Sequence, residues 1–537
     1  MSKLFEKLME KRGISADFLL PDYDKLSSGE SLPDMEQAVA RITEAVRKGE
    51  KVLIYGDYDA DGVTASVVMH DTLKLVGIKE VEIMLPNRFA DGYGMSEKVV
   101  ERAVCDKVGL VITVDCGSGN REIVAKLTEA GIDTIITDHH ECPEELPEAV
   151  AVVNPKRAKK SEWRDLAGVG VAFMLAHRLM EKGLIPQGQE KWLLDMVAIG
   201  TICDNMKLRG VNRCLVYWGM KVIEKTRRVG LRELIKRAGA KKINSYAVGF
   251  ILGPRLNAGG RMKSAEVALE LMMTESKVES AKLAEELEQL NIKRRSEQSR
   301  ALAEIKQSES VPMPVMVVAG NWHEGVLGII AGNLTEDMKR PSFVLTEVDG
   351  VYKGSGRSFG EFDLAQALQA CKDEIIGGGG HAGACGVKIE KAKLDDFRKA
   401  VNDYYKSLGL VDQERFLEKE ADIEIDDLSE VDMELMAELD KLEPFGEGNL
   451  EPVWLIRDAL VLNAQKLGQD EQHLKLTIAD GKKQLVLIAF HAPREWLKVR
   501  EGMRRDFTVR LMVNEWNGLT SVEGVIEKIG VEKSGEF

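Results

Sequence analysis

The sequence predicts a multidomain α/β protein with a doubly wound parallel sheet, a long connecting helix, a second α/β domain and a small C-terminal β-barrel. Three observations lead to this prediction. Between residues 52 and 155, short β-branched runs alternate with helical patterns, as in a doubly wound parallel sheet. Residues 276–307 form one polar helical pattern without Gly or Pro. Residues 423–537 contain five short apolar runs, which fit the five strands of an OB-fold.

The first half of the chain is predicted to contain a helical arm and then the parallel sheet. The arm spans residues 1–45, and the first domain spans 46–275. A helix is expected over 63–76, and mainly helical structure over 168–270. The strands of the sheet are predicted at 52–56, 81–85, 110–114, 133–137 and 149–153.

The second half is predicted to hold two smaller domains. A connecting helix over 276–310 leads into a second domain at 311–405. A charged linker at 406–422 precedes the barrel domain at 423–537. Strand-like runs lie at 314–319 and 342–346 in the second domain, and at 453–456, 474–478, 485–489, 507–513 and 520–526 in the barrel.

The composition excludes several classes of protein. The chain of 537 residues is too long for one core, and no stretch is apolar enough to span a membrane. Taken alone, the net charge of −14 argues against a nucleic-acid binder. This argument is weak, because binding depends on local basic patches and because bound metals can neutralise an acidic site. Its seven cysteines form no CxxC pair, and the N-terminus has no signal-peptide core, so we expect a cytoplasmic protein.

Acidic clusters follow three of the predicted strands. Asp57, Asp59 and Asp61 follow the first, Asp115 follows the third, and Asp138-His139-His140 follow the fourth. Because ligand sites lie beyond the carboxyl ends of parallel strands, these side chains should converge at one edge of the sheet. If the chain stayed extended after the first strand, its three alternating aspartates would face one way before Gly62 turned into the helix.

So many carboxylates could not remain ionised together without cations. Carboxylate oxygens suit Mg²⁺ or Mn²⁺, and His favours Mn²⁺, Fe²⁺ or Zn²⁺ over Mg²⁺ alone. A single Asp-rich segment is more often a solvated turn or a helix N-cap, and Asp204 alone would be an ordinary loop residue. Together, these residues fit two metals roughly 3.5–4 Å apart. With no Walker A motif or serine-hydrolase elbow, metal-assisted hydrolysis of a phosphoester or phosphoanhydride is the leading class.

Basic and glycine-rich segments could supply the opposite charge. The runs Gly354–Ser358 and Gly377–Gly383 could form phosphate cradles, although flexible loops are as good an interpretation. Residues 255–261 offer Arg255 and Arg261 as further anion ligands. Basic groups at 156–160 and 293–295 could follow a nucleic-acid backbone, or could be solvated helix faces.

These motifs resemble those of the DHH phosphoesterase superfamily. The superfamily is named after an Asp-His-His motif, which is present here as Asp138-His139-His140. The order is similar: Asp-x-Asp-x-Asp-Gly at 57–62, Asp-Cys-Gly at 115–117, the DHH triplet and then Asp204. Gly-Gly-Gly-His at 378–381 resembles the DHH-associated domain. Within the superfamily, the chain resembles the RecJ family of 5′→3′ exonucleases specific for single-stranded DNA. The segments that carry this likeness are 86–94, 253–258 and 442–449.

The resemblance implies roles for individual residues. The domain at 46–275 would be the catalytic domain, and 311–405 would bind substrate. The catalytic residues would be Asp59, Asp61, Asp115, His139, His140 and Asp204. The metal ligands would be Asp57, Asp59, Asp61, Asp115, His139 and Asp204. Arg88, Ser355 and Arg357 would lie near the 5′ end, and Arg255, Asn257 and Arg261 near the scissile phosphate. Gly379, Gly380 and His381 would bind substrate from the facing domain.

We therefore expect an Mn²⁺- or Mg²⁺-dependent exonuclease that releases mononucleotides from single-stranded DNA in repair and recombination. A monomer is expected, with a single-strand-binding protein or a helicase as the protein partner. The barrel should grip the strand by aromatic stacking, with Trp454, Phe490, Trp496 and Trp516 as candidates. Two alternatives are a phosphoesterase acting on oligoribonucleotides, cyclic dinucleotides or pyrophosphate, and a non-catalytic replication scaffold. The OB-like barrel argues against the first, and the intact acidic motifs against the second.

Overall fold

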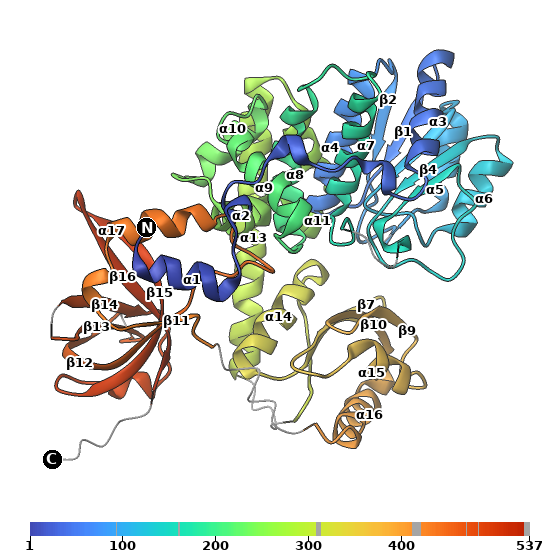
Figure 1. Ribbon diagram of the computed structural model, residues 1–537. Helices are drawn as coiled ribbons and strands as arrows, with labels where there is room; N and C mark the ends of the chain where they lie inside the picture. Colours follow the sequence, from blue (N-terminus) through green and yellow to red (C-terminus); the bar gives the residue numbers. More distant parts are fainter. Residues whose placement is uncertain are drawn as a thin grey trace.

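A computed structural model of the chain describes residues 1–92, 94–158, 162–307, 313–410, 420–468, 470–481 and 483–530. Tyr93, Lys159 and Lys160, which belong to motifs named above, lie outside these ranges, as does most of the predicted linker. Three sheets form three bodies; a long helix joins two of them, and the barrel lies on one side of that helix (Figure 1). Among the described helices, none has the length and apolarity needed to cross a bilayer.

The first sheet confirms the predicted doubly wound core. All of its neighbouring strands are parallel, so their carboxyl ends share one edge. The β3 strand is buried along its whole length, as its apolar sequence predicts. In spatial order, the strands are β2 (Val81–Met84), β1 (Val52–Tyr55), β3 (Leu110–Val114), β4 (Asp133–Thr137) and β5 (Ala151–Val153).

Helices cover both faces of this sheet. Val52 and Ile54 of β1 face one core, and Leu53 and Tyr55 face the other, as the alternation of a strand requires. The helices of the first core are α3 (Met35–Lys48), α4 (Ala60–Leu75) and α7 (Gly168–Glu181). Those of the second core are α5 (Glu97–Cys105) and α6 (Arg121–Glu129).

A helical region extends the first core toward the connecting helix. It contains α8 (Leu194–Cys203), α9 (Gly210–Ile223), α10 (Val229–Ala238), the π-helix η5 (Ala247–Leu252), α11 (Gly253–Met262) and α12 (Glu266–Met273). The connecting helix α13 (Lys277–Gln307) buries Leu283 and Leu287 against this region, as its apolar stripe predicts. Further along α13, Ala301 and Ile305 pack on α14 (Leu327–Met338), so one helix supports two bodies.

The second sheet shows that the interpretation of the glycine runs as loops was wrong. It has the order β6 (Met316–Gly320), β7 (Ser342–Val348), β8 (Val351–Arg357), β10 (Ala384–Glu390) and β9 (Gly377–His381). Gly354 and Gly356 lie in β8, and the four-glycine run lies in the edge strand β9. A Cβ on Gly356 would lie 2.7 Å from the sulfur of Cys385, so close packing on the sheet explains that glycine. Two helices on the opposite face from α14 complete the domain: α15 (Leu364–Ala370) and α16 (Leu394–Ser407).

The C-terminal strands form a closed barrel in the order β11 (Ile423–Ile425), β12 (Trp454–Leu467), β13 (His473–Ala479), β14 (Gln484–Ala489), β16 (Leu519–Ile529) and β15 (Arg504–Trp516). Pairing of β12 with β15 closes it. Trp454 is fully buried in the barrel core, so its prediction as a stacking residue was wrong. The alternating pattern of β12 directs this large ring inward.

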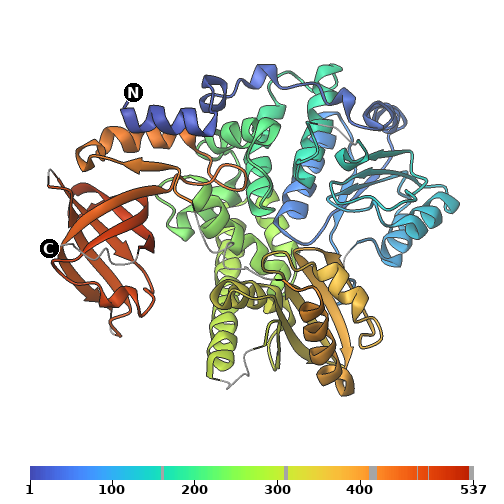
Figure 2. The same cartoon turned by 60° about the horizontal axis from the view of Figure 1, so that its bottom comes forward.

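The predicted N-terminal arm is divided between two bodies. Helix α1 (Lys3–Arg12) packs on the barrel beside α17 (Met433–Leu439), whereas α3 packs on the first sheet. Leu4, Phe5 and Leu8 enter the barrel core, and the backbone N–H of Ser2 donates to the Glu438 carboxylate. Figure 2 shows the start of the chain beside the barrel and its continuation across the helical region.

Candidate metal centre

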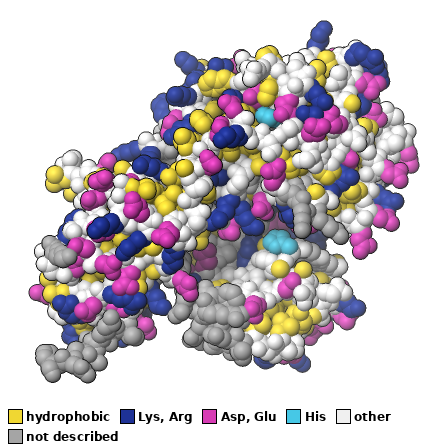
Figure 3. Space-filling view, in the orientation of Figure 1, with side chains coloured by type: hydrophobic (Ala, Val, Ile, Leu, Met, Phe, Trp, Pro, Cys, Tyr) yellow, Lys and Arg dark blue, Asp and Glu magenta, His cyan; other side chains and the backbone are white. Residues whose placement is uncertain are grey.

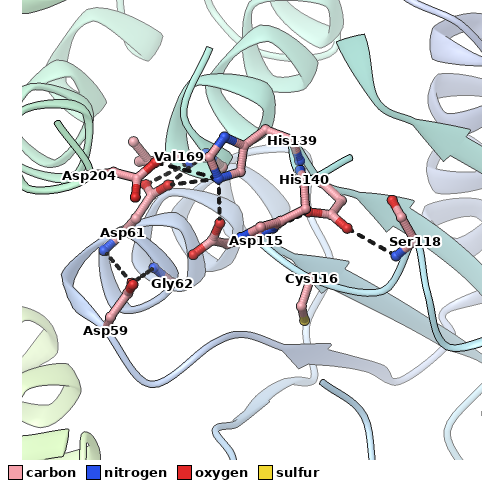
Figure 4. A network of polar contacts seen from close by, with 12 residues as sticks. Asp59, Asp61, Gly62, Asp115, Cys116, Ser118, His139, His140, Val169 and Asp204 are labelled. Carbon is pink, nitrogen blue, oxygen red and sulfur yellow. Dashed lines mark hydrogen bonds and ion pairs between the residues drawn. The ribbon is translucent and has the colours of Figure 1, made fainter. Parts of the chain in front are cut away.

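The acidic residues gather at the carboxyl edge of the first sheet. Asp57 and Asp59 follow β1, Asp115 follows β3, and His139 follows β4. Asp204 reaches the same place from the C-terminal end of α8 (Figure 4). Three sets of ligand atoms each lie within 4.8 Å of one another: Asp115, His139 and His140; Asp61, His139 and Asp204; Asp57, Asp59 and Asp115.

The chain after β1 does not stay extended, so the predicted alternation of the three aspartates was wrong. Asp59 is the N-cap of α4, and its Oδ1 accepts hydrogen bonds from the backbone N–H groups of Asp61 and Gly62 at 2.9 and 3.0 Å. The helix therefore begins at Ala60, three residues before the predicted start at 63. A Cβ on Gly62 would lie 2.5 Å from the carbonyl oxygen of Asp57, so only glycine allows this turn to close.

Asp61 is held by a helix that the sequence did not connect to the site. Its two carboxylate oxygens accept hydrogen bonds from the backbone N–H groups of Gly168 and Val169, at 2.7 and 2.9 Å. These groups form the start of α7, where the helix dipole stabilises negative charge. The Gly-Val-Gly start of an apolar helix was the available signal, but it did not name the partner.

His139 lies at the centre of the cluster. Its Nε2 atom is 3.1 Å from Oδ1 of Asp115, 3.5 Å from Oδ2 of Asp204 and 3.9 Å from Oδ2 of Asp61. The ring is almost fully buried. Carboxylates from three segments thus surround one imidazole nitrogen.

Two buried carboxylate oxygens show that the cluster fits a cation. Oδ1 of Asp57 and Oδ1 of Asp115 are buried and accept no hydrogen bond from the described residues. Such atoms are costly without a partner, and a divalent ion would supply one. The backbone of Asp115 also has a φ of 60°, and a Cβ on Gly168 would lie 2.5 Å from the Asp115 Cβ. The surroundings therefore hold this carboxylate in an unfavourable backbone conformation.

Asp138, which was not among the predicted metal ligands, has both carboxylate oxygens engaged by neighbouring groups. Its Oδ1 accepts a hydrogen bond from the backbone N–H of His139 at 2.7 Å and lies 2.8 Å from Nδ1 of His140. Its Oδ2 accepts from the backbone N–H of Ser118 at 2.9 Å. Asp138 therefore orients the two histidines. Asn154 was not predicted to belong to the site. Its Nδ2 donates to the His140 carbonyl at 3.0 Å, and its position directly after the last strand of the sheet was the available signal.

Burial and mutual repulsion disturb the acids when no cation is bound. Burial, followed by the charge of Asp59, raises the pKa of Asp57 to about 8 and that of Asp61 to about 7. Burial and Asp61 raise the pKa of Asp204 to about 8. The pKa of Asp115 is raised by burial and by the same neighbours.

The two histidines differ in protonation. Burial and the charge of His140 lower the pKa of His139 to about 4, so its ring is neutral and able to bind a metal. Burial opposes protonation of His140, but its hydrogen bond to Asp138 and the nearby carboxylates outweigh burial and raise its pKa to about 9. His140 therefore brings a positive charge to the edge of the cluster.

A group of arginines lies beside the acids. Burial, followed by the charges of Arg88, Arg294 and Arg357, lowers the pKa of Arg261 to about 10. Arg88 lies over the ring of Tyr58 at 5.0 Å, and Arg357 donates to Oγ of Ser355 at 3.1 Å. Lys and Arg side chains gather in the hollow between the first body and the second sheet (Figure 3).

The other predicted substrate residues have different surroundings. Arg255 is paired with Glu288 of α13 at 2.5 Å, and Oδ1 of Asn257 accepts from the backbone N–H of Ala60 at 3.0 Å. Asn257 thus helps to fix the start of α4. Gly379, Gly380 and His381 lie on the exposed edge strand β9, outside the carboxylate cluster.

Three segments match known domain families. Residues 51–201 match the DHH family, N-terminal domain, residues 311–407 match the DHHA1 domain, and residues 421–528 match the RecJ OB domain. Crystal structures of RecJ from Thermus thermophilus with Mn²⁺ and with Mg²⁺ superpose with TM-scores of 0.84 and 0.80, at 27% and 26% identity. The superpositions cover 99% of this chain and 76% and 75% of those chains.

Curated relatives give the family. The single-stranded-DNA-specific exonuclease RecJ of Bacillus subtilis is 35% identical over 93% of this chain, which spans 64% of that protein. The protein of the same name from Haemophilus influenzae is 32% identical over 92% of this chain and 90% of its own length. The three domain families occur in order along this chain, and the Haemophilus influenzae protein is matched at 32% identity over 90% of its own length. The chain therefore belongs to the RecJ family of DHH proteins.

Proposed function

We propose that this chain is a metal-dependent exonuclease that degrades single-stranded DNA from the 5′ end to mononucleotides, in DNA repair and recombination. The observation that carries the proposal is the contact between Nε2 of His139 and the carboxylates of Asp115 and Asp204, beside a group of half-buried arginines. The named activity of the RecJ relatives supports single-stranded DNA as the substrate.

The acids and His139 would hold two Mn²⁺ or Mg²⁺ ions. The ligands we propose are Asp57, Asp59, Asp61, Asp115, His139 and Asp204. When bound, the ions supply a nucleophilic hydroxide at neutral pH and neutralise the charge that develops on the phosphoryl group. Oδ1 of Asp57 and Oδ1 of Asp115, which are buried and accept no hydrogen bond from the described residues, support this assignment; the Asp115 oxygen faces Nε2 of His139 at 3.1 Å. The hydrogen bonds from Gly168 and Val169 would keep Asp61 in place whether or not metal is bound.

The arginine group would bind phosphates of the strand. Arg88, Arg261 and Arg357, with Ser355, are proposed for the 5′ end. Arg261 lies near Asp59, Arg88 and Arg357 lie near Arg261, and Arg357 donates to Ser355. A buried guanidinium with a lowered pKa gains from a phosphate, since the anion offsets the repulsion among the arginines. His140 would add a further positive charge at the reacting phosphate.

The scissile phosphate would be bound by Arg255 and Asn257. The second sheet, which faces the metal centre, would bind the strand through Gly379, Gly380 and His381. Asn257 also fixes the first turn of α4 through Ala60, so its effect on catalysis would include the position of Asp59 and Asp61. Arg255 would have to exchange its carboxylate partner, Glu288, for phosphate. The exposed position of β9 leaves its backbone accessible to a strand of DNA.

We propose that the barrel grips the strand away from the cut. Among the predicted stacking residues, Phe490 and Trp516 are 62% and 72% exposed, and Trp496 is partly buried against the barrel core. Exposed rings of this kind stack on bases without regard to sequence. A small-substrate phosphoesterase would have no use for such a barrel, and a non-catalytic scaffold would not need the full ligand set.

We assign functional units to the segments predicted above. They are an arm at 1–45, whose last helix packs on the first sheet, a catalytic domain at 46–275, a connecting segment at 276–310 that contains α13, a substrate-binding domain at 311–405, a linker at 406–422 and a nucleic-acid-binding barrel at 423–537. We propose that the protein acts as a monomer and that a helicase or a single-strand-binding protein delivers the single strand to it. The cytoplasm, where chromosomal DNA is exposed to a bacterial exonuclease, is the proposed location, and seven free cysteines fit its reducing conditions.

The test is a product ladder from strands labelled at one end or the other. With Mn²⁺, we expect a 3′-labelled strand to shorten one nucleotide at a time, and a 5′-labelled strand to give labelled mononucleotide at once. EDTA should stop both reactions. Equal hydrolysis of a dinucleotide and a long strand would instead favour a small-substrate enzyme. Labelled mononucleotide released at once from the 3′-labelled strand, before any shortened intermediates, would contradict the polarity.

A further inference from the structure

Two exposed aromatic rings stack on each other outside the site described above. Tyr246 and Phe250 are 58% and 72% exposed, with ring centroids 5.1 Å apart and planes inclined by 24°. Phe250 lies in the π-helix η5, and Tyr246 is the residue before it. Residues four apart are neighbours on a helix surface, and π-helical turns are rare and found frequently at functional sites. A Phe this exposed has apolar surface available to a ligand.

The segment carrying these rings is attached to the start of the barrel unit. Ser245, directly before Tyr246, donates through Oγ to Glu443 at 2.9 Å and accepts from the backbone N–H of Phe445 at 3.1 Å. Lys242 forms an ion pair with Asp440 at 2.8 Å. One end of the aromatic pair is therefore fixed where the barrel joins the first body.

The other side of the same segment packs on the end of α8, which carries Asp204. A Cβ on Gly249 would lie 3.3 Å from Ile202, and one on Gly253 would lie 2.5 Å from the sulfur of Cys203. The barrel joint also touches the chain just beyond, since the backbone N–H of Leu208 donates to the Glu447 carbonyl at 2.8 Å. The rings thus belong to a short bridge between the barrel and the Asp204 corner of the metal centre.

Positive charge lies next to this bridge. Arg255, just over one turn after Phe250, donates to the Ile251 carbonyl at 2.7 Å and is paired with Glu288 at 2.5 Å. Burial, followed by the charges of Arg295 and Arg255, lowers the pKa of Arg294 on α13, and its Nε is buried without a hydrogen bond from the described residues. A stacking surface beside cations is the combination by which proteins bind single-stranded nucleic acid.

We infer that Phe250, supported by Tyr246, is a base-stacking platform for the single strand between the barrel and the metal centre. This inference rests on the proposed exonuclease function and adds a specific subsite to it. One base would stack on the ring of Phe250, at a fixed number of nucleotides from the phosphodiester that is cleaved. Phe250 supplies the free ring face, and Tyr246 backs it from the other side.

The experiment combines Phe250→Ala with a scan of abasic sites along a fluorescent oligonucleotide, measured as binding affinity in EDTA. For the wild type, one abasic position should weaken binding at least about fivefold, the lower end of what stacking contributes per base. Phe250→Ala should weaken binding of the intact strand by the same factor and should lose sensitivity to that one position. Phe250→Trp should restore both. Val278→Ala, which alters another exposed apolar side chain, should behave as wild type.

Two outcomes would overturn the inference. An unchanged affinity in Phe250→Ala would show that the ring does not bind DNA and would favour a protein ligand for it. An affinity loss with the abasic pattern of the wild type intact would show a structural role without stacking. If the proposed function itself were wrong, the wild type would give neither strand binding nor a product ladder, which differs from both outcomes.

Discussion

Nε2 of His139 lies 3.1 Å from Oδ1 of Asp115. The two residues follow adjacent parallel strands, in which Val114 pairs with Thr137. The parallel ladder therefore sets their separation, and the left-handed backbone of Asp115 turns its carboxylate toward the imidazole. Because this oxygen is buried and accepts no hydrogen bond in the described structure, we expect the pair to share a metal ion.

Replacing Asp115 with Asn should separate activity from stability. Asn has nearly the same shape and tolerates a positive φ, but it removes one charge from a repelling cluster. We expect Asp115→Asn to lose at least about 100-fold in cleavage rate with Mn²⁺, since mutating even the outer-shell partners of a metal typically costs about 10- to 100-fold. The metal-free variant should melt higher than the metal-free wild type, as calorimetry would measure. Asp426→Asn, at an exposed surface ion pair, is the control; normal cleavage by Asp115→Asn would refute the ligand assignment.

The metal-free protein should become less stable as pH rises from 6 to 8. The pKa values of Asp57 and Asp204 are about 8 and that of Asp61 is about 7, all above the ordinary value of 3.8. In this range the folded acids hold protons that the unfolded chain has released, so deprotonation disfavours the fold. Metal binding displaces those protons, and the rise in Tm on adding Mn²⁺ should therefore grow with pH. A Tm shift that shrinks between pH 6 and pH 8 would be the opposite result.

Adding one methyl group at Gly168 should damage the metal centre. A Cβ there would lie 2.5 Å from Cβ of Asp115, and Gly168 also donates its N–H to Asp61. We expect Gly168→Ala to lower the cleavage rate at least about tenfold, since small displacements of reacting groups are costly. Gly119→Ala is a matched control, because nothing lies within 4 Å of its added Cβ. Steady-state kinetics with both variants would decide, and equal rates would show that Asp115 tolerates displacement.

Removing a half-buried guanidinium should weaken recognition of the 5′ phosphate. We expect Arg261→Gln and Arg357→Gln to raise KM for 5′-phosphorylated strands about 10- to 100-fold, as loss of a charge-assisted hydrogen bond does. The effect on 5′-hydroxyl strands should be smaller. Arg102→Gln, which alters an exposed ion pair with Glu82, should leave KM unchanged. The same loss on both kinds of strand would place these arginines elsewhere along the DNA.

Much of the fold could be predicted because the relevant signals are local. The buried runs ending at Tyr55, Val114 and Thr137 specify parallel strands by themselves, and parallel strands place the residues that follow them at one edge. The polar α13 helix was predictable for the same reason, since its stripe and lack of Gly or Pro are properties of one segment.

The details of the site depended on contacts between distant segments. Asp61 is held by Gly168, and Arg255 is paired with Glu288, and neither partner can be chosen from spacing alone. At Asp59, capping of α4 competes with extension of β1, and the hydrogen bonds to the next turn favour the helix. The glycine runs were misread because the reason for Gly356 is the packing of Cys385 and Phe343 from neighbouring strands.

The most direct test of the metal centre is the anomalous scattering of Mn²⁺ in crystals of the full chain. We predict two peaks roughly 3.5–4 Å apart among the carboxylates of Asp59, Asp61, Asp115 and Asp204 and the ring of His139. Peaks lost in Asp115→Asn crystals would tie the ions to this carboxylate. Manganese bound elsewhere, with these side chains left free of metal in an active enzyme, would contradict the account.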